Sequence, residues 1–176
     1  MSLFYIDENI INNENELNFN FVIDYLEKRF EIKHNIDLLV SLIGNSWYYF
    51  IEGNINQSPI EYNPEKFLCK WEKYIDIGLN EFNENPTFCL IAGYTLMLHG
   101  FFIDPSYEKV GIKLLENCSK SHADLNLIQL SKYWLFNYNA KKYKLDKKID
   151  LNKVCDNLFN SKTLLDKYFR EILKRK

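Results

Sequence analysis

The sequence predicts an all-α fold, and three observations support this prediction. Apolar residues recur at helical spacing along nearly the whole chain of 176 residues. Asn63–Pro64, Asn85–Pro86 and Asp104–Pro105 each pair a side chain that caps free helix amides with a proline suited to the first helical position. Strand signals are nearly absent, because only "LFYI" at residues 3–6 offers an alternative to helix.

The N-terminal half predicts three helices after a polar segment. Residues 1–18 are rich in asparagine and acidic residues, so we expect this segment to be exposed and partly extended. A first helix carries the apolar stripe Val22, Leu26 and Phe30. A second helix, closed by Gly53, carries Leu39, Ile43, Trp47, Phe50 and Ile51. The third, over residues 64–82, has the inner stripe Phe67, Trp71, Ile75 and Leu79.

The least polar stretch, "NPTFCLIAGYTLMLHGFFIDP" at residues 85–105, is expected to be core. The fourth helix, over residues 86–99, carries apolar side chains on nearly all of its sides, so neighbouring helices must enclose it. Ala92 and Gly93 are small enough to let one of these neighbours approach closely, and Gly100 ends the helix.

Four further helices are expected toward the C-terminus. The fifth covers residues 105–118, and the sixth presents Leu127, Leu130, Tyr133, Trp134 and Phe136. Asp150 and Ser161 are candidate N-caps of two short helices, and a Lys-rich loop precedes them at residues 140–149. Eight helices joined by short loops predict a single domain, residues 1–176, of stacked antiparallel helical hairpins in a tetratricopeptide-like or irregular bundle.

One helix pair resembles a known repeat. The stretch "AGYTLMLHGFFIDPSYEKVGIKLLENCSK" at residues 92–120 is similar to the helix pairs of tetratricopeptide and Sel-one-like repeats. In this comparison Ala92 and Gly93 are the small residues of the first helix, and Tyr107 stands on the second. No second copy follows at the ~34-residue period of such repeats. The resemblance therefore implies stacked hairpins, not a tandem array.

No motif predicts a catalytic, cofactor or metal site, so we expect a non-enzymatic protein without cofactor or metal. The cysteines are too far apart for zinc-finger spacing: Cys69, Cys89, Cys118 and Cys155. Glu31 and His34 form half of a di-iron motif, but neither other histidine has a glutamate three residues earlier. A nucleophile elbow, a dinucleotide fingerprint and a phosphate-binding loop are all missing.

His99 is the one histidine expected beside the core. We expect it to donate to the last carbonyls of its helix and to complement the helix dipole. Cys89 lies ten residues earlier on the same helix, hence ~15 Å away, which is too far for a catalytic pair.

The chain is expected to be cytoplasmic, with reduced thiols and no membrane span. Its first residues, "MSLFYIDENI", contain neither a basic leader nor an apolar run of signal-peptide length. The longest apolar stretch is shorter than the ~20 residues that cross a bilayer. We expect a monomer or a weak homodimer.

Charge is distributed unevenly along the chain. Residues 1–66 contain 11 acids and 4 bases, a net charge of −7, whereas residues 133–176 contain 5 acids and 12 bases, a net charge of +7. On the first helix, Asp24, Glu27 and Glu31 share one face at i, i+3 and i+7. These aligned like charges predict either neutralisation by a basic helix of the same protein or a face kept for a basic partner.

Four adjacent aromatics, "WYYF" at residues 47–50, add a candidate contact surface. A helix cannot turn all four inward, so we expect Tyr48 or Tyr49 to be exposed beside the carboxylates. The predicted partner-binding residues are Asp7, Glu8, Glu14, Glu16, Asp24, Glu27, Glu31, Tyr48 and Tyr49.

The C-terminal lysines offer an alternative function. Lys141, Lys142, Lys144, Lys147 and Lys148, with an interleaved tyrosine, could grip a phosphate backbone. Arginine, which reads and stacks on bases, occurs only three times, so charge balance is the favoured interpretation and nucleic acid the less favoured partner.

In overall character the chain resembles the immunity proteins of bacterial contact-dependent inhibition and related polymorphic toxin systems. The resemblance is carried by the acidic "DENIINNENEL" segment, the carboxylates of the first helix and the hairpin pattern. It implies a protein-binding module that covers the active site of a cognate toxin domain, often a nuclease. The alternatives are a nucleic-acid-binding or regulatory helical domain and an enzyme with an unrecognised site.

Overall fold

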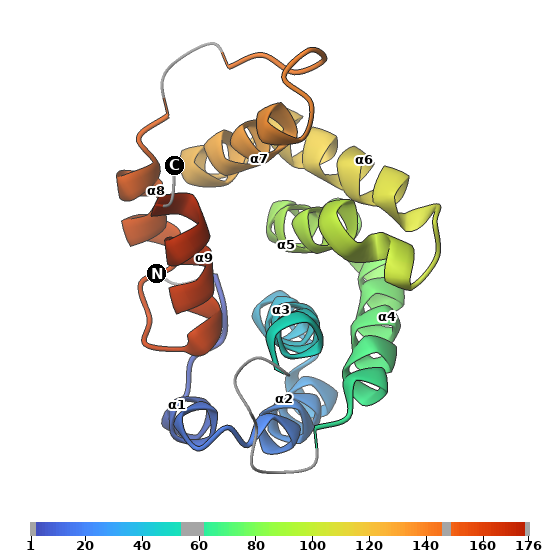
Figure 1. The fold of residues 1–176 in the computed structure, drawn as a ribbon, viewed down its shortest axis with the longest axis vertical. Helices are drawn as coiled ribbons and strands as arrows, with labels where there is room; N and C mark the ends of the chain where they lie inside the picture. Colours follow the sequence, from blue (N-terminus) through green and yellow to red (C-terminus); the bar gives the residue numbers. More distant parts are fainter. Residues whose placement is uncertain (1–2, 54–61, 146–148, 175–176) are drawn as a thin grey trace.

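A computed structural model of the protein describes residues 3–53, 62–145 and 149–174, and these contain nine α-helices, one short 3₁₀ helix and no strand (Figure 1). The all-α prediction is confirmed. The helices are α1 (Glu8–Asn15), α2 (Phe19–Lys33), α3 (Ile36–Glu52), α4 (Pro64–Glu81), α5 (Pro86–His99), η1 (Gly100–Phe102), α6 (Tyr107–Lys120), α7 (Leu125–Tyr138), α8 (Leu151–Leu158) and α9 (Leu164–Lys174).

Helices α3 and α5 lie in the middle of the molecule, and the other helices surround them (Figure 1). Helix α4 packs on α3 and α6 packs on α5, as expected for hairpins of consecutive helices. Helix α3 also contacts α5, and α5 contacts α7. Both inner helices are buried along most of their length, as the apolar stretches in the sequence predicted.

Side-chain caps begin α4, α5 and α8 where the sequence predicted them. Asn63 accepts from the Lys66 amide and Asn85 from the Thr87 amide. Asp150 likewise caps α8. The predicted start at Asp104–Pro105 is wrong, because Asp104 accepts the Ser106 amide in the turn before α6, which begins at Tyr107. The predicted cap at Ser161 is wrong, because its amide donates to the Asp166 carboxylate in a turn that precedes α9.

The N-terminal segment is more ordered than its composition predicted. Part of it forms α1, which is capped by Asp7, whose carboxylate accepts the Asn9 amide at 2.8 Å. Ile10 and Glu14, one turn apart, are both buried. The expectation of an exposed, partly extended segment is therefore wrong for Glu8–Asn15, because one side of this polar helix faces the interior.

Two glycines set the distance between α5 and α6. A Cβ atom added to Gly93 would lie 3.0 Å from the Gly111 carbonyl oxygen. A Cβ atom added to Gly111 would lie 2.4 Å from the Met97 amide nitrogen. The prediction that Ala92 and Gly93 admit a neighbouring helix is confirmed, and Gly111 is the matching small residue on that neighbour.

Helix α9 packs against the series formed by α3, α5 and α7. Its Phe169 is fully buried and stands at the centre of an aromatic cluster. The centroids of six other rings lie within 4.8–6.1 Å of the Phe169 centroid, those of Phe159, Tyr94, Phe4, Tyr168, Trp134 and Trp47. This one side chain therefore joins the C-terminal helix to the N-terminal segment and to α3, α5 and α7.

We expect Phe169→Ala to lower the free energy of unfolding by ~4 kcal/mol, because it removes a fully buried ring and leaves a cavity between helices. Phe21→Ala is the matched control. Phe21 is 41% exposed on α2, so its loss should cost less than ~1 kcal/mol. Urea titration followed by circular dichroism measures both values, and equal effects would contradict the central position of Phe169.

Candidate functional site

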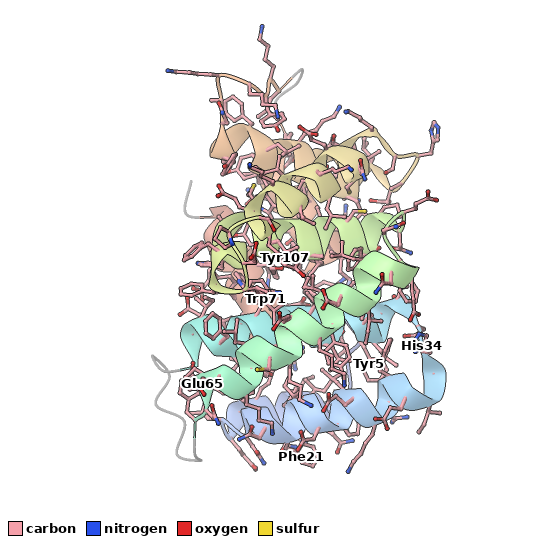
Figure 2. All side chains as sticks on the ribbon, turned by 90° about the vertical axis from the view of Figure 1, so that its right-hand side faces the viewer. Tyr5, Phe21, His34, Glu65, Trp71 and Tyr107 are labelled. Carbon is pink, nitrogen blue, oxygen red and sulfur yellow. The ribbon has the colours of Figure 1, made fainter. Side chains whose placement is uncertain are left out.

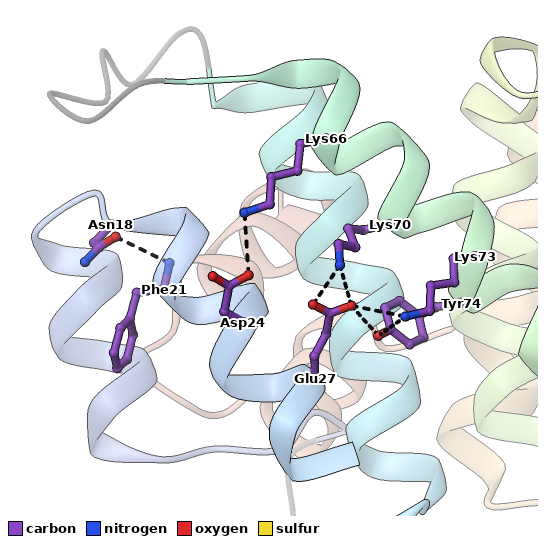
Figure 3. A network of polar contacts seen from close by, with 8 residues as sticks. All are labelled: Asn18, Phe21, Asp24, Glu27, Lys66, Lys70, Lys73 and Tyr74. Atoms are coloured by element: carbon purple, nitrogen blue, oxygen red, sulfur yellow. Dashed lines mark hydrogen bonds and ion pairs between the residues drawn. The ribbon is translucent and has the colours of Figure 1, made fainter. Parts of the chain in front are cut away.

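The acidic face of α2 is mostly neutralised inside the protein (Figure 3). Glu27 accepts from the Lys70 ammonium at 2.6 and 2.7 Å, from the Tyr74 hydroxyl at 2.6 Å and from Lys73 at 3.3 Å. Burial raises the pKa of Glu27, but these hydrogen bonds outweigh it, so the pKa is lowered. A basic helix of the same protein, α4, therefore neutralises this carboxylate.

The other two acids of this face differ in their surroundings. Asp24 forms an exposed ion pair with Lys66 at 3.5 Å (Figure 3). Glu31 is exposed, and its carboxylate forms no hydrogen bond or ion pair with any described residue. Of the two predictions for this face, neutralisation by the same protein therefore holds for Asp24 and Glu27. Glu31 remains available to a basic partner.

Asp7 is held in a small polar cluster beside α2. Its Oδ2 accepts from the Tyr25 hydroxyl at 2.7 Å and from the Tyr5 hydroxyl at 3.2 Å, and Arg29 lies 3.6 Å away. Burial raises the pKa of Asp7, but the hydrogen bonds from Tyr25, Asn9 and Tyr5 lower it overall. Asp7 therefore joins α1 to α2, and the tyrosines already occupy its carboxylate.

Glu14 cannot contact a partner, because only 1% of its surface is exposed. Its carboxylate accepts from the Tyr49 hydroxyl at 2.9 Å and from the Leu164 amide, the first of α9, at 2.8 Å. Burial raises the pKa of Glu14 to about 7. The predicted binding role of Glu14 is corrected to a structural one, which is to join α1, α3 and α9.

Tyr48 and Tyr49 are both buried, so the prediction that one of them is exposed is wrong. Tyr49 stacks on Phe19 of α2 at 4.2 Å, and Tyr48 contacts Tyr168 of α9 at 5.2 Å. Four adjacent side chains of α3 can all be covered because neighbouring helices enclose it on several sides. The exposed aromatic ring in this region is Phe21, which projects from the outer side of α2 (Figure 2).

Of the nine predicted residues, the exposed carboxylates without a described partner are those of Glu8, Glu16 and Glu31. Glu8 and Glu31 lie on α1 and α2 and Glu16 directly follows α1, and these two helices lie at one end of the long axis of the molecule (Figure 1). The structure does not bring the predicted residues together into one binding surface, since the other six are buried or paired.

A cavity that the sequence did not predict opens among the last turns of three helices, and its volume is about 310 Å³. Its lining residues are Tyr94, Met97 and Leu98 of α5, Tyr133, Trp134, Asn137 and Tyr138 of α7, and Ile172 and Leu173 of α9. The rings of Tyr94 and Trp134 are in contact, with centroids 4.0 Å apart and planes tilted by 30°.

Large apolar side chains are exposed around and beside this cavity. Leu98 and Tyr138, which line it, are 37% and 42% exposed, and the neighbouring Phe101 and Phe102 of η1 are 54% and 46% exposed. We call these four residues the apolar rim. The prediction that residues 85–105 are core is correct as far as Met97 and wrong at Leu98, Phe101 and Phe102, because the short η1 turn directs both phenylalanines outward.

Neither His99 nor Cys89 lines this cavity, and the two side chains do not form a catalytic pair. The His99 Nδ1 accepts the Trp47 indole N–H at 3.1 Å, and burial lowers the pKa of this histidine. The predicted role of complementing the helix dipole as a cation is therefore not supported. Burial raises the pKa of Cys89 to about 12 and that of Cys118 to about 11, which keeps both thiols protonated. Cys69 is exposed.

Among the described residues, no group of histidine, cysteine and acidic side chains is placed to hold a metal ion. Within the same ranges, no helix combines the length and the apolar character needed to cross a bilayer. Comparisons with protein-family models, curated proteins and solved structures give no match to this chain. A function therefore has to rest on the geometry and chemistry of the chain itself.

The raised pKa of Glu14 predicts a pH-dependent stability. The folded protein binds this proton more tightly than the unfolded chain, whose Glu titrates near 4.5. The free energy of unfolding should therefore fall by up to ~3 kcal/mol as the pH rises from 4.5 through 7. Urea titrations at pH 5 and 7.5 should show a smaller pH difference in Glu14→Gln than in the wild type. Glu16→Gln, two residues away and exposed, should keep the wild-type difference, and an unaltered difference in Glu14→Gln would refute this role.

Glu27 gives the opposite dependence. Its lowered folded pKa means that its contribution is present above pH 4.5 and is lost as the pH falls through the folded pKa. We expect Glu27→Gln to cost ~1–2 kcal/mol at pH 7, because hydrogen bonds to a charged acceptor are replaced by neutral ones. At pH 3 the difference should shrink. Glu31→Gln, one turn away and unpaired, should leave stability nearly unchanged, and a loss equal to that of Glu27→Gln would argue against the α4 contacts as the cause.

Proposed function

We propose that the protein is a non-enzymatic protein-binding module whose partner docks on the apolar rim. The observation that carries this proposal is the exposure of Leu98 and Tyr138 at the cavity and of Phe101 and Phe102 in the η1 turn that follows α5. Clustered apolar exposure of this kind is rare on a monomer surface without a binding role. Phenylalanine and tyrosine are enriched at protein interfaces, where large rings provide contact area.

The packing beneath the rim favours a preformed docking surface. The Phe101 and Phe102 rings lie 4.4 Å apart, and Phe102 also contacts Phe50 of α3 at 5.2 Å and the His99 ring at 6.2 Å. His99 is in turn fixed by its hydrogen bond from Trp47. A partner would therefore meet side chains that are already positioned, which lowers the entropic cost of association.

The more specific form of the proposal is an immunity protein that binds and neutralises a cognate toxin domain. The support for it is the resemblance in sequence character together with a surface suited to a protein partner. In this account the exposed carboxylates Glu8, Glu16 and Glu31 attract a basic toxin domain from a distance, while the rim holds it. Nucleic acid binding receives less support, because Lys142 is engaged by Glu116 at 3.0 Å. Lys147, Lys148, Arg175 and Lys176 lie outside the described residues.

The test is co-expression with the C-terminal domain encoded by the neighbouring upstream gene. The wild-type chain should restore growth and form a complex with that domain. Phe101→Asp combined with Phe102→Asp should weaken binding at least ~30-fold, mainly through faster dissociation, because it places charges where two anchor rings were. Circular dichroism checks that this variant is folded, as expected for exposed positions.

Glu31→Lys, on α2 and away from the residues that line the cavity, is the control. It should slow association and reduce its salt dependence while leaving the dissociation rate unchanged. Surface plasmon resonance at two salt concentrations separates the two effects. Full affinity in the folded double phenylalanine variant would eliminate the rim as the docking surface, and no binding by the wild type would refute the immunity assignment.

A further inference from the structure

The cavity inside the rim is suited to a neutral and largely apolar group. Four aromatic rings, a methionine and three aliphatic side chains line it, together with the Asn137 amide, and none of these carries a formal charge. Transferring a charged group into such surroundings costs far more than transferring a neutral one. Its volume of about 310 Å³ is at the lower end for ligand pockets, which fits a single side chain or a small ring compound.

Two polar groups on the cavity wall have no partner within the described residues. Tyr94 is 7% exposed and Trp134 is 4% exposed, yet no described residue forms a hydrogen bond with the Tyr94 hydroxyl or the Trp134 indole N–H. Buried tyrosine and tryptophan normally satisfy these atoms. Both residues line the cavity, and neither atom is sealed from solvent as the Trp71 indole N–H is.

The chemistry of these two groups selects among the possible side chains. An indole N–H only donates, so the entering group needs an acceptor near Trp134. A tyrosine hydroxyl both donates and accepts. A phenol oxygen can accept from an indole N–H and can exchange a hydrogen bond with a tyrosine hydroxyl, whereas a phenylalanine ring has no polar atom and a tryptophan ring offers only a donor. The aromatic walls and the Met97 sulfur favour a ring as the body of the group.

We propose that this cavity receives the phenol ring of a tyrosine side chain of the partner protein, an inference that rests on the proposed protein-binding function. Leu98 and Tyr138 at the mouth then cover the main chain on either side of the inserted tyrosine. An aromatic anchor in a desolvated pocket, surrounded by apolar contacts that exclude water, is the usual form of an interface hot spot.

The experiment uses p-cresol, the isolated tyrosine side chain, and toluene, the phenylalanine side chain, titrated into the full chain and followed by NMR chemical shifts. We expect p-cresol to bind about fivefold more tightly than toluene, equivalent to a net hydrogen-bond contribution of ~1 kcal/mol, although toluene is the more apolar compound. In Tyr94→Phe this preference should fall to within about twofold, since the hydroxyl is lost and the ring is kept.

Tyr107→Phe is the matched control. The Tyr107 hydroxyl donates to Asp76 at 2.9 Å, outside the cavity, so its removal should leave the preference unchanged. A second pair of probes, N-acetyl-tyrosinamide and N-acetyl-phenylalaninamide, tests whether the main chain of a protein partner clears the mouth. The tyrosine compound should again be preferred.

Three results would overturn the proposal. These are no preference for p-cresol over toluene, a preference that survives Tyr94→Phe, and binding of p-cresol without binding of N-acetyl-tyrosinamide. The last result would assign the cavity to a free small phenol and not to a protein side chain. Because these titrations need no partner, their failure would leave the test of Phe101 and Phe102 standing.

Discussion

The fold depends on the insertion of Phe169 among the inner helices. Helices α3, α5 and α7 each bring an aromatic side chain to one place, Trp47, Tyr94 and Trp134, and helix α9 closes over them. Without α9, these rings would form an open apolar face, whose exposure to water is unfavourable at ~25 cal/mol per Å². The C-terminal helix is therefore an integral part of the core. Glu14 adds a second tie, since its buried carboxylate accepts the first amide of the same helix.

This closure determines which surfaces remain for function. On the α2 side, the carboxylates that could have met a partner are largely used inside the protein, Glu27 by α4 and Asp7 by two tyrosines. At the last turns of α5, α7 and α9, the covering is incomplete, and a cavity and an exposed apolar rim are left. These two observations favour binding through hydrophobic anchors, with charge acting at a distance. They do not favour binding through a continuous acidic face.

Much of the helical architecture was predictable from the sequence, because caps and apolar periodicity are local signals. The starts at Asn63–Pro64 and Asn85–Pro86 and the enclosure of α5 followed directly from them. The polar helix α1 was missed because one buried turn, Ile10 and Glu14, gives little periodic signal. Burial of Tyr48 and Tyr49 and the pairing of Glu27 with Lys70 depend on neighbours more than a dozen residues away. Most of the rim lies within the apolar stretch of residues 85–105, in which the sequence alone does not distinguish buried from exposed side chains.

The most direct test of the account is native-state hydrogen exchange of α9 compared with that of α3 and α5. If α9 completes the core, its amides should exchange only in the same cooperative opening as those of the two inner helices, with similar free energies and the same dependence on denaturant. Exchange of α9 at a much lower free energy, while α3 and α5 stay protected, would show a detachable helix laid over a core that is stable without it. That result would contradict the account, and the cavity bounded by Ile172 and Leu173 would lose its fixed wall.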